Sequence, residues 1–157
     1  MSARVGIGFD AHRFASGRAL ILGTIAVDHP EGLAGHSDGD VLTHAIVDAI
    51  LGAAGLGDIG SHFPSDDPTW KDADGSVFLQ RAVRLARDAG YRVQSVDATV
   101  VCEAPRLDPY RDKIQSALKD AAGVEALSVK ATTTDGMGFT GRGEGIAALA
   151  VALLEPV

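Results

Sequence analysis

The segment RVGIGFDAH at residues 4–12 constrains the fold most strongly, because its residues alternate between two kinds. Successive side chains of a β-strand point to opposite faces. One face would carry Val5, Ile7 and Phe9, and we expect this apolar face to pack against a core. The other face would carry two glycines followed by Asp10 and His12, which point the same way. The segment therefore predicts a strand that ends in a functional site.

Helical spacing of apolar residues predicts three helices. The first begins near Asp38, where Ser37 and Asp40 have the spacing of a capping box, and it runs through the apolar residues between 41 and 50. The second covers residues 76–89 and ends before a glycine. The third has Asp108 as N-cap, with a proline at its first position and Gly123 past its end.

Several segments have strand character. Residues 18–27 form two extended stretches broken at Gly23, residues 93–105 alternate like a strand, and residues 127–135 are rich in β-branched side chains. The apolar run 146–154 is too short to cross a membrane and is compatible with a buried helix or strand; we interpret it as a final helix. Residues 61–75 predict a long functional loop or lid. The alternation predicts one α/β (α+β) domain over residues 1–157, a two-layer sandwich whose mixed sheet carries helices on one face.

The composition excludes several classes of protein. Hydrophobic residues make up 46% of the 157 positions and charged residues 22%, as in globular domains. A net charge of −7 argues against nucleic acid as a partner, and no segment is long enough for a membrane span. The single cysteine, Cys102, cannot form an intrachain disulfide and fits a reducing compartment. Only four residues precede the first strand, so no signal peptide is expected and a cytoplasmic location is predicted.

A candidate metal site combines the first strand with the first helix. If the two elements pack together, Asp10, His12 and His44 can form a three-ligand set, which is typical of catalytic zinc with one open position. His44 would lie on a polar outer face of the helix between Asp40 and Asp48, and Asp48 could support a ligand histidine. The alternatives are that Asp10 and His12 form a surface pair, and that His44 simply bonds to its acidic neighbours.

Two further segments suit phosphate. His36 and Ser37 precede a helix N-terminus, which favours an anion, although Ser37 could equally serve as a cap. The segment KATTTDGMGFTGRGEG joins threonine hydroxyls to Asp135 and a glycine-rich turn, which could hold phosphoryl oxygens and a hard cation. It lacks the Walker pattern, and threonines on a strand are often only good strand formers.

Four ordered segments together resemble the 2-C-methyl-D-erythritol 2,4-cyclodiphosphate synthase family, and the resemblance runs essentially end to end. The segments are GFDAHRF, GHSDGDVLTHAIVDAILGAAGLGDIGSHFP, EAPRL and KATTTDGMGFTGRGEGIAALAV. The resemblance implies that 4-diphosphocytidyl-2-C-methyl-D-erythritol 2-phosphate is cyclised by attack of its 2-phosphate on the β-phosphate, with release of CMP. Agreement of four segments in order is far more specific than a match to one short motif.

The same resemblance implies the cofactors. Asp10, His12 and His44 would bind Zn²⁺ or another divalent transition metal. Asp135 falls where the family has an acidic ligand for Mg²⁺ or Mn²⁺ bridging the α- and β-phosphates. Some members carry glutamate there, and the shorter aspartate leaves open whether the ion is bound directly or through water.

Site residues follow from the resemblance in the same way. His36 and Thr133 would contact phosphates in the transition state, Asp58 to Gly60 would contact the ribose, and a second segment would form the cytosine pocket. The complete set of substrate-binding positions is Asp10, His12, His36, Ser37, Asp58, Ile59, Gly60, Phe63, Pro64, Cys102, Ala104, Pro105, Arg106, Leu107, Thr132, Thr133, Thr134, Asp135, Phe139 and Arg142.

The resemblance also implies a homotrimer whose active sites lie between subunits and whose sheets pack around a threefold axis. Phe9, Phe139 and Arg142 match positions that in some members line an axial cavity for an isoprenoid diphosphate; ordinary core or interface packing is the alternative for the two phenylalanines. Two other functions are alternatives. One is a metal-dependent phosphoesterase that uses Asp10, His12 and His44 to activate water. The other is a non-catalytic trimeric sensor of isoprenoid diphosphates, which would have little need for those three ligands.

Overall fold

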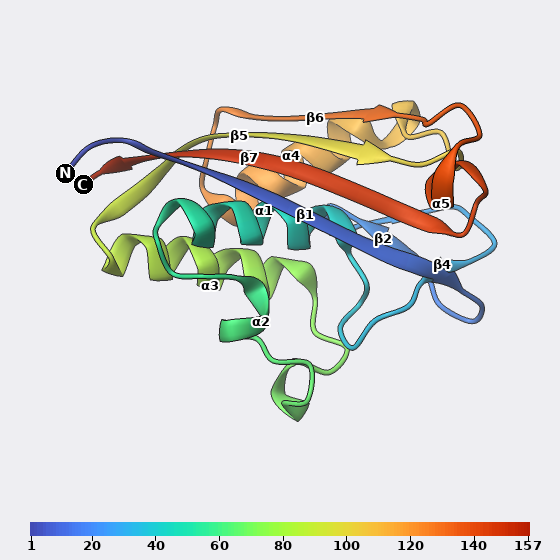
Figure 1. The fold of residues 1–157 in the computed structure, drawn as a ribbon, viewed down its shortest axis with the longest axis horizontal. Helices are drawn as coiled ribbons and strands as arrows, with labels where there is room; N and C mark the ends of the chain where they lie inside the picture. Colours follow the sequence, from blue (N-terminus) through green and yellow to red (C-terminus); the bar gives the residue numbers. More distant parts are fainter.

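The computed structural model describes residues 1–157 as a five-stranded sheet with helices on one face (Figure 1). The order of its strands is β4 (Gly32–Leu33), β1 (Arg4–Ala15), β7 (Gly145–Pro156), β5 (Tyr91–Val101) and β6 (Leu127–Thr132). The strands β5 and β6 pair in parallel and all other neighbours are antiparallel, so the sheet is mixed as predicted.

Three helices form the second layer: α1 (Val41–Ala53), α3 (Gly75–Asp88) and α4 (Arg111–Ala122). Shorter elements are the hairpin β2 (Leu20–Leu22) and β3 (Ile25–Val27), the helical turns α2 (Ile59–His62) and α5 (Gly138–Gly141), and two 3₁₀ turns at Pro68–Trp70 and Asp108–Tyr110. The predicted break at Gly23 is confirmed, since Gly23 and Thr24 both have positive φ in the hairpin turn. No helix has the length and apolar character needed to cross a membrane.

Close packing of β1 against α1 positions the site. A Cβ atom built on Gly6 or Gly8 would overlap the carbonyl oxygen of Ala49 or Ala45 on the helix. The two glycines therefore allow the helix backbone to approach the strand directly. Asp10 and His12 follow on the same strand face, beyond the point of closest approach.

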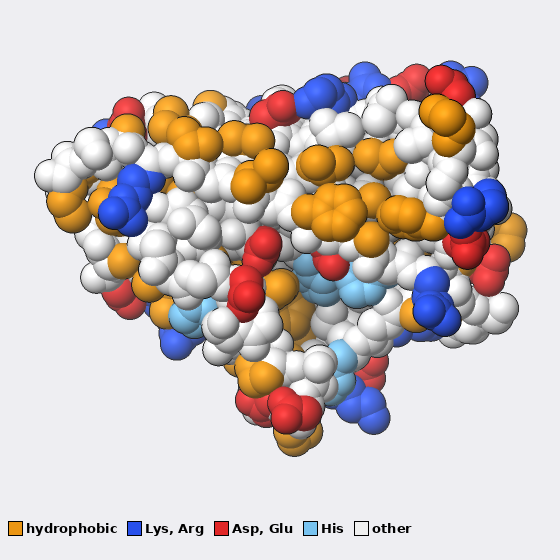
Figure 2. Space-filling view, in the orientation of Figure 1, with side chains coloured by type: hydrophobic (Ala, Val, Ile, Leu, Met, Phe, Trp, Pro, Cys, Tyr) orange, Lys and Arg blue, Asp and Glu red, His pale blue; other side chains and the backbone are white.

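The expected orientation of β1 is wrong, although its alternation is confirmed. Val5, Ile7 and Phe9 do not reach the core and are 68%, 69% and 56% exposed. The glycine face is the buried one, because all three helices lie on that side of the sheet. Ile7 pairs with Val151 and Phe9 with Leu149 on the open face, and Figure 2 shows hydrophobic side chains gathered along this part of the molecule.

The last apolar run is a strand and not the predicted helix. Residues 145–156 form β7, which lies between β1 and β5 at the centre of the sheet. Its even-numbered residues from 146 to 154 pack under the helices, whereas Leu149 and Val151 lie on the open face. Apolar residues on both faces remove the period-two pattern that would have identified the strand.

Two predicted helix starts are also wrong. The first helix begins at Val41, and Asp40 is its N-cap through a bond from the Thr43 amide at 3.1 Å, so Ser37 is not a capping residue. The third begins at Arg111 after a 3₁₀ turn, and Asp108 is not its N-cap but pairs with Arg111. The predicted end at Gly123 is confirmed, with φ at +67°.

Candidate active site

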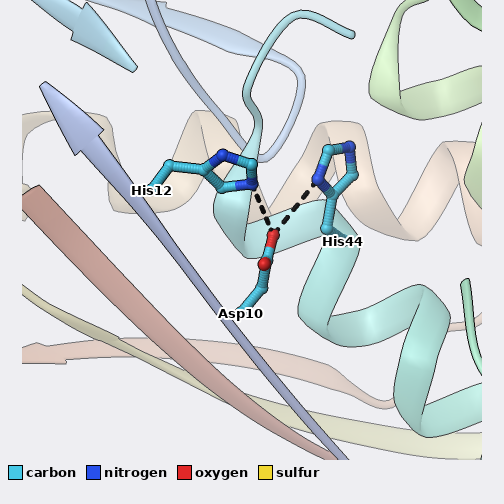
Figure 3. A group of neighbouring side chains, drawn as sticks. All are labelled: Asp10, His12 and His44. Carbon is cyan, nitrogen blue, oxygen red and sulfur yellow. Dashed lines mark hydrogen bonds and ion pairs between the residues drawn. The ribbon is translucent and has the colours of Figure 1, made fainter. Parts of the chain in front are cut away.

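Asp10, His12 and His44 converge as predicted on a single point between β1 and α1. His12 Nε2 lies 2.7 Å and His44 Nδ1 lies 3.2 Å from the same oxygen, Asp10 Oδ2. One ligand atom from each residue lies within 4.8 Å of the others. Figure 3 shows both imidazole rings directed at this carboxylate, from the strand and from the helix. These distances allow the three side chains to share one ion.

The remaining ring nitrogens already have partners, which fixes the orientation of both histidines. His12 Nδ1 lies 2.6 Å from the carbonyl oxygen of Ala34 and so donates to it. In the neutral form of His12, the form that binds a metal, the lone pair is therefore on Nε2, the atom that faces Asp10. His44 Nε2 lies 3.1 Å from Ser37 Oγ. A carboxylate oxygen and two imidazole nitrogens, with both rings held by a second partner, form a donor set that fits a divalent metal ion.

The contacts between Asp10 and the two histidines also shift the pKa values of Asp10 and His12. Burial would raise the pKa of Asp10, but hydrogen bonds from His12 and His44 outweigh it and lower the pKa to about 2. Burial would lower the pKa of His12, but its bond to Asp10 and the charge of that carboxylate leave the pKa above its usual value. The raised pKa means that Asp10 favours a proton on His12, and this proton would compete with a cation for the position between the two residues.

The surroundings of His44 differ from the prediction of a polar outer face. His44 is buried, and the edge of its ring packs against Phe78 at 5.5 Å between centroids. Asp40 turns away from it to cap the helix and to accept from the amides of Gly23 and Thr24. Asp48 accepts from the Ile59 amide at 3.0 Å and supports no histidine. The bonds to acidic neighbours that would have made His44 an ordinary surface residue are absent.

A cavity of about 540 Å³ opens beside the three ligands, a size typical of sites for small molecules. Figure 2 shows histidine side chains beside a hollow in this region of the surface. The cavity brings together most of the predicted residues of the first half of the chain, together with aromatic side chains that the sequence did not indicate. Its lining includes Asp10, His12, His36, Ser37, His44, Ile59, Gly60, Phe63, Pro64, Trp70 and Phe78.

The helix N-terminus does not provide the anion site that was expected. The buried Asp40 carboxylate already occupies the first turn of α1. His36 and Ser37 line the cavity nevertheless, from the loop before the helix. His36 Nε2 lies 3.0 Å from the Asp67 carbonyl oxygen, which ties this loop to the segment around Trp70. Asp58 is the N-cap of α2, and its Oδ1 accepts a hydrogen bond from the Ser61 amide at 2.9 Å.

A second, smaller depression of about 240 Å³ lies where the parallel strands β5 and β6 end. It includes Cys102, Pro105, Arg106, Leu107, Thr132 and Thr133 among its lining residues. Burial and the nearby Glu103 carboxylate raise the pKa of the Cys102 thiol to about 11, so the sulfur is protonated and unreactive at neutral pH. The predicted second half of the site thus also forms a depression of its own.

The turn beside this depression carries Asp135 in a left-handed conformation, with φ at +53°. Thr133 Oγ1 donates to Asp135 Oδ1 at 3.3 Å, and Thr134 Oγ1 donates to the Met137 carbonyl oxygen at 2.6 Å. Sequence reasoning missed Glu103, whose Oε1 accepts from the amides of Thr134 and Gly136 at 3.1 and 3.3 Å. The only feature of the sequence that could have indicated Glu103 is its position near the end of a predicted strand and next to the residues of the expected cytosine pocket.

The cavity beside the three ligands and the second depression lie at the same end of the sheet but are separate within one chain; they are called the first and the second depression below. His12 pairs with Ile146 on β7, Val101 on β5 pairs with Ala147, and Thr132 on β6 pairs with Val101. Three strand spacings therefore separate β1 from β6, or about 14 Å. Phe139 and Arg142 lie at this end as well and are exposed; Arg142 forms an ion pair with Glu144 at 2.6 Å. Phe9 and Phe139 are not core residues in this chain.

Comparison with known proteins identifies relatives over the whole chain. Residues 3–155 match the model of the YgbB family. The 2-C-methyl-D-erythritol 2,4-cyclodiphosphate synthase of Moorella thermoacetica is 54% identical over 153 residues, which cover 96% of this chain and 94% of that protein. The bifunctional enzyme IspD/IspF of Erythrobacter litoralis is 55% identical over 97% of this chain, which spans only 40% of that protein's length.

A solved structure shares the fold. The CDP complex of IspF from Plasmodium falciparum is 31% identical and superposes with a TM-score of 0.86, covering 99% of this chain and 97% of that one.

Proposed function

The chain belongs to the YgbB family, and from this membership and the geometry of the site we propose that it is a cyclising, CMP-releasing enzyme. Its substrate would be 4-diphosphocytidyl-2-C-methyl-D-erythritol 2-phosphate, and its product 2-C-methyl-D-erythritol 2,4-cyclodiphosphate. The observation that carries the proposal is the convergence of Asp10, His12 and His44 on the wall of a cavity large enough for the methylerythritol phosphates.

The residues of the chain have separable roles in this reaction. The 2-phosphate and the β-phosphate belong to one molecule, so the protein's main task is to hold them in line for attack. His36, on the cavity wall, would contact phosphate oxygens, while Phe63 and Trp70 would exclude water from the methylerythritol. Exclusion of water favours attack by the internal phosphate over hydrolysis. Thr133 would donate to a phosphate oxygen from the second depression.

Asp10, His12 and His44 would hold a zinc or similar divalent ion. When bound, that ion supplies a Lewis acid and a template for a β-phosphate oxygen. The bonds from His12 Nδ1 to Ala34 and from His44 Nε2 to Ser37 keep the two rings aimed at the ligand position. Asp135 would hold Mg²⁺ or Mn²⁺ beside the α- and β-phosphates; its hydrogen bond from Thr133 joins the two residues assigned to the phosphates.

The nucleotide would bind in the second depression. The CDP complex of the Plasmodium falciparum relative supports a cytidine nucleotide as part of the substrate. Pro105 and Leu107 would provide backbone groups and apolar surface for the cytosine, whereas Arg106 is exposed and lies 3.6 Å from Asp108. The turn from Asp58 to Gly60, of which Ile59 and Gly60 line the first depression, would contact the ribose.

We propose a homotrimer as the active form, because one chain separates the two depressions. The open sheet face exposes the apolar side chains of Val5, Ile7, Phe9, Leu149 and Val151 on the paired strands β1 and β7, and a contiguous apolar patch of this kind suits an interaction surface. Packing of these faces around a threefold axis would bury them and bring the first depression of one chain to the second depression of its neighbour. Phe139 and Arg142 would then lie near the axis, where an isoprenoid diphosphate could bind.

Analysis of the product tests the proposed reaction. The purified chain is incubated with the cytidyl substrate in water enriched in ¹⁸O and followed by ³¹P NMR and mass spectrometry. We expect a cyclic diphosphate, an equal amount of CMP and no ¹⁸O in either product. An open-chain phosphate containing ¹⁸O would show a phosphoesterase instead, and binding without turnover would show a sensor.

A further inference from the structure

Arg18 is a half-buried arginine in the turn between β1 and β2, outside both depressions. Its guanidinium donates through Nη1 to the Gly35 carbonyl oxygen at 2.7 Å and through Nη2 to the Ser37 carbonyl oxygen. These two carbonyls flank His36. Neither accepts a backbone hydrogen bond, so Arg18 is their partner in the chain. The arginine thus fixes the carbonyl groups of the residues before and after His36, which lines the cavity.

The segment that Arg18 holds, residues 34–37, supports both histidines of the candidate metal site. Its first residue, Ala34, accepts from His12 Nδ1, and its last, Ser37, bonds to His44 Nε2. A Cβ on Gly35 would lie 3.3 Å from the His12 ring, so the backbone there packs directly on the imidazole. A shift of this segment would therefore rotate both rings at once.

The geometry requires the shape of a guanidinium group. Its planar fork presents two N–H donors to two separate carbonyl oxygens at the same time. A lysine ammonium is a compact point charge without this planar fork, so it would hold the two carbonyl oxygens with less directional control. The contact with the carbonyl oxygens of Gly35 and Ser37 therefore depends on the shape of the arginine side chain and not only on its charge.

We propose that Arg18 is a positioning residue that holds segment 34–37 so that His12 and His44 stay aimed at the metal and His36 at the substrate. The inference rests on the proposed function, because it assigns Arg18 a role in the metal site described above. Loss of a group that bonds directly to a metal ligand changes the metal affinity by about 10- to 100-fold. Arg18 acts through the segment that carries such groups, Ala34 and Ser37, so its loss should have a smaller effect.

The test compares zinc affinity in Arg18→Met, Arg18→Lys and the wild-type chain by competition with a chromogenic chelator, and records thermal unfolding in parallel. Arg84→Met, on the exposed face of α3, is the matched control. We expect zinc binding to weaken several-fold, up to about 10-fold, in Arg18→Met, less in Arg18→Lys, and not at all in the control. Guanidinium ion at a subdenaturing concentration should restore part of the affinity in Arg18→Met and none in the control.

Each outcome decides the matter. Unchanged zinc affinity in folded Arg18 variants, or a fall in unfolding temperature alone, would overturn the positioning role and leave the proposed function intact. If Arg18→Met does not fold, the folded Arg18→Lys variant decides by the same measurement. Failure of the wild-type chain to bind zinc would instead overturn the proposed metal site itself.

Discussion

Gly8 on β1 lies against Ala45 on α1 so closely that a Cβ atom at Gly8 would overlap the Ala45 carbonyl oxygen. The same contact repeats one pleat earlier, between Gly6 and Ala49. This close approach brings the carboxylate of Asp10 within hydrogen-bond distance of His44 on the helix.

Replacing Gly8 with alanine should therefore separate strand and helix. The overlapping atoms belong to the helix backbone and cannot move aside, so we expect Gly8→Ala to lower the free energy of unfolding by about 3 kcal/mol or more. Gly52→Ala is the control, because Gly52 is an exposed glycine of the same helix whose added Cβ meets no atom closer than 3.9 Å. It should stabilise by about 0.5 to 1 kcal/mol. Equal effects in urea denaturation would contradict the account.

Asp40 should be more important for stability than an ordinary helix cap. It is fully buried and accepts from the amides of Gly23, Thr24 and Thr43 and from the Thr43 hydroxyl. Asp40→Ala leaves buried donors without partners, and we expect a loss of about 3 kcal/mol. Asp74→Ala removes the exposed cap of α3 and should cost about 1 kcal/mol. A smaller loss at Asp40 than at Asp74 in the same denaturation assay would refute this reading.

The pH dependence of metal-free stability follows from the pair Asp10 and His12. The pKa of Asp10 is lowered to about 2, so its contribution is present above its unfolded pKa of 3.8 and is lost as pH falls toward 2. The pKa of His12 is raised, so its contribution is present below 6.5 and is lost as pH rises through the raised value. The pair therefore stabilises the chelator-treated protein most between about pH 4 and 6.5.

Asp10→Asn isolates this effect. Thermal unfolding of the two chelator-treated proteins across pH should differ by about 1 to 2 kcal/mol inside that window, with convergence on both sides. A difference that keeps growing above pH 7 in the absence of metal would have the wrong sign for a raised histidine pKa.

Cys102 should react slowly with thiol reagents. A pKa raised from 9.0 to about 11 lowers the thiolate fraction near pH 8 by about 100-fold, and burial restricts access as well. Reaction with a disulfide reagent should be slow in the native chain and fast in urea. Comparable rates in the two states would show that the thiol is not buried in solution.

The sequence predicted which side chains gather at the candidate metal site better than it predicted the packing around them. The alternation of residues 4–12 and the two histidines sufficed to group Asp10, His12 and His44, because the spacing places polar groups on one strand face and on one helix. It could not show which strand face is buried. Val5, Ile7 and Phe9 are as apolar as core residues, yet the helices cover the glycines, since helix contact needs small residues and not only apolar ones.

The remaining errors have the same kind of cause. The run Ile146 to Leu154 has apolar residues on both faces, which fits a central strand and a buried helix equally until the neighbours are known. Asp48 has helical spacing from His44, but its carboxylate caps the Ile59 amide, a partner that only the tertiary fold supplies. Arg18 and Glu103 act through backbone groups distant in sequence, so no local motif marks them.

Anomalous diffraction at the zinc edge tests the central claim most directly, on crystals of the chain grown with zinc and a cytidine nucleotide. We predict one peak per chain, bonded to Asp10 Oδ2, His12 Nε2 and His44 Nδ1, and no peak at this position in His44→Ala. A zinc ion held by other residues, or wild-type crystals without a peak between β1 and α1, would contradict the account.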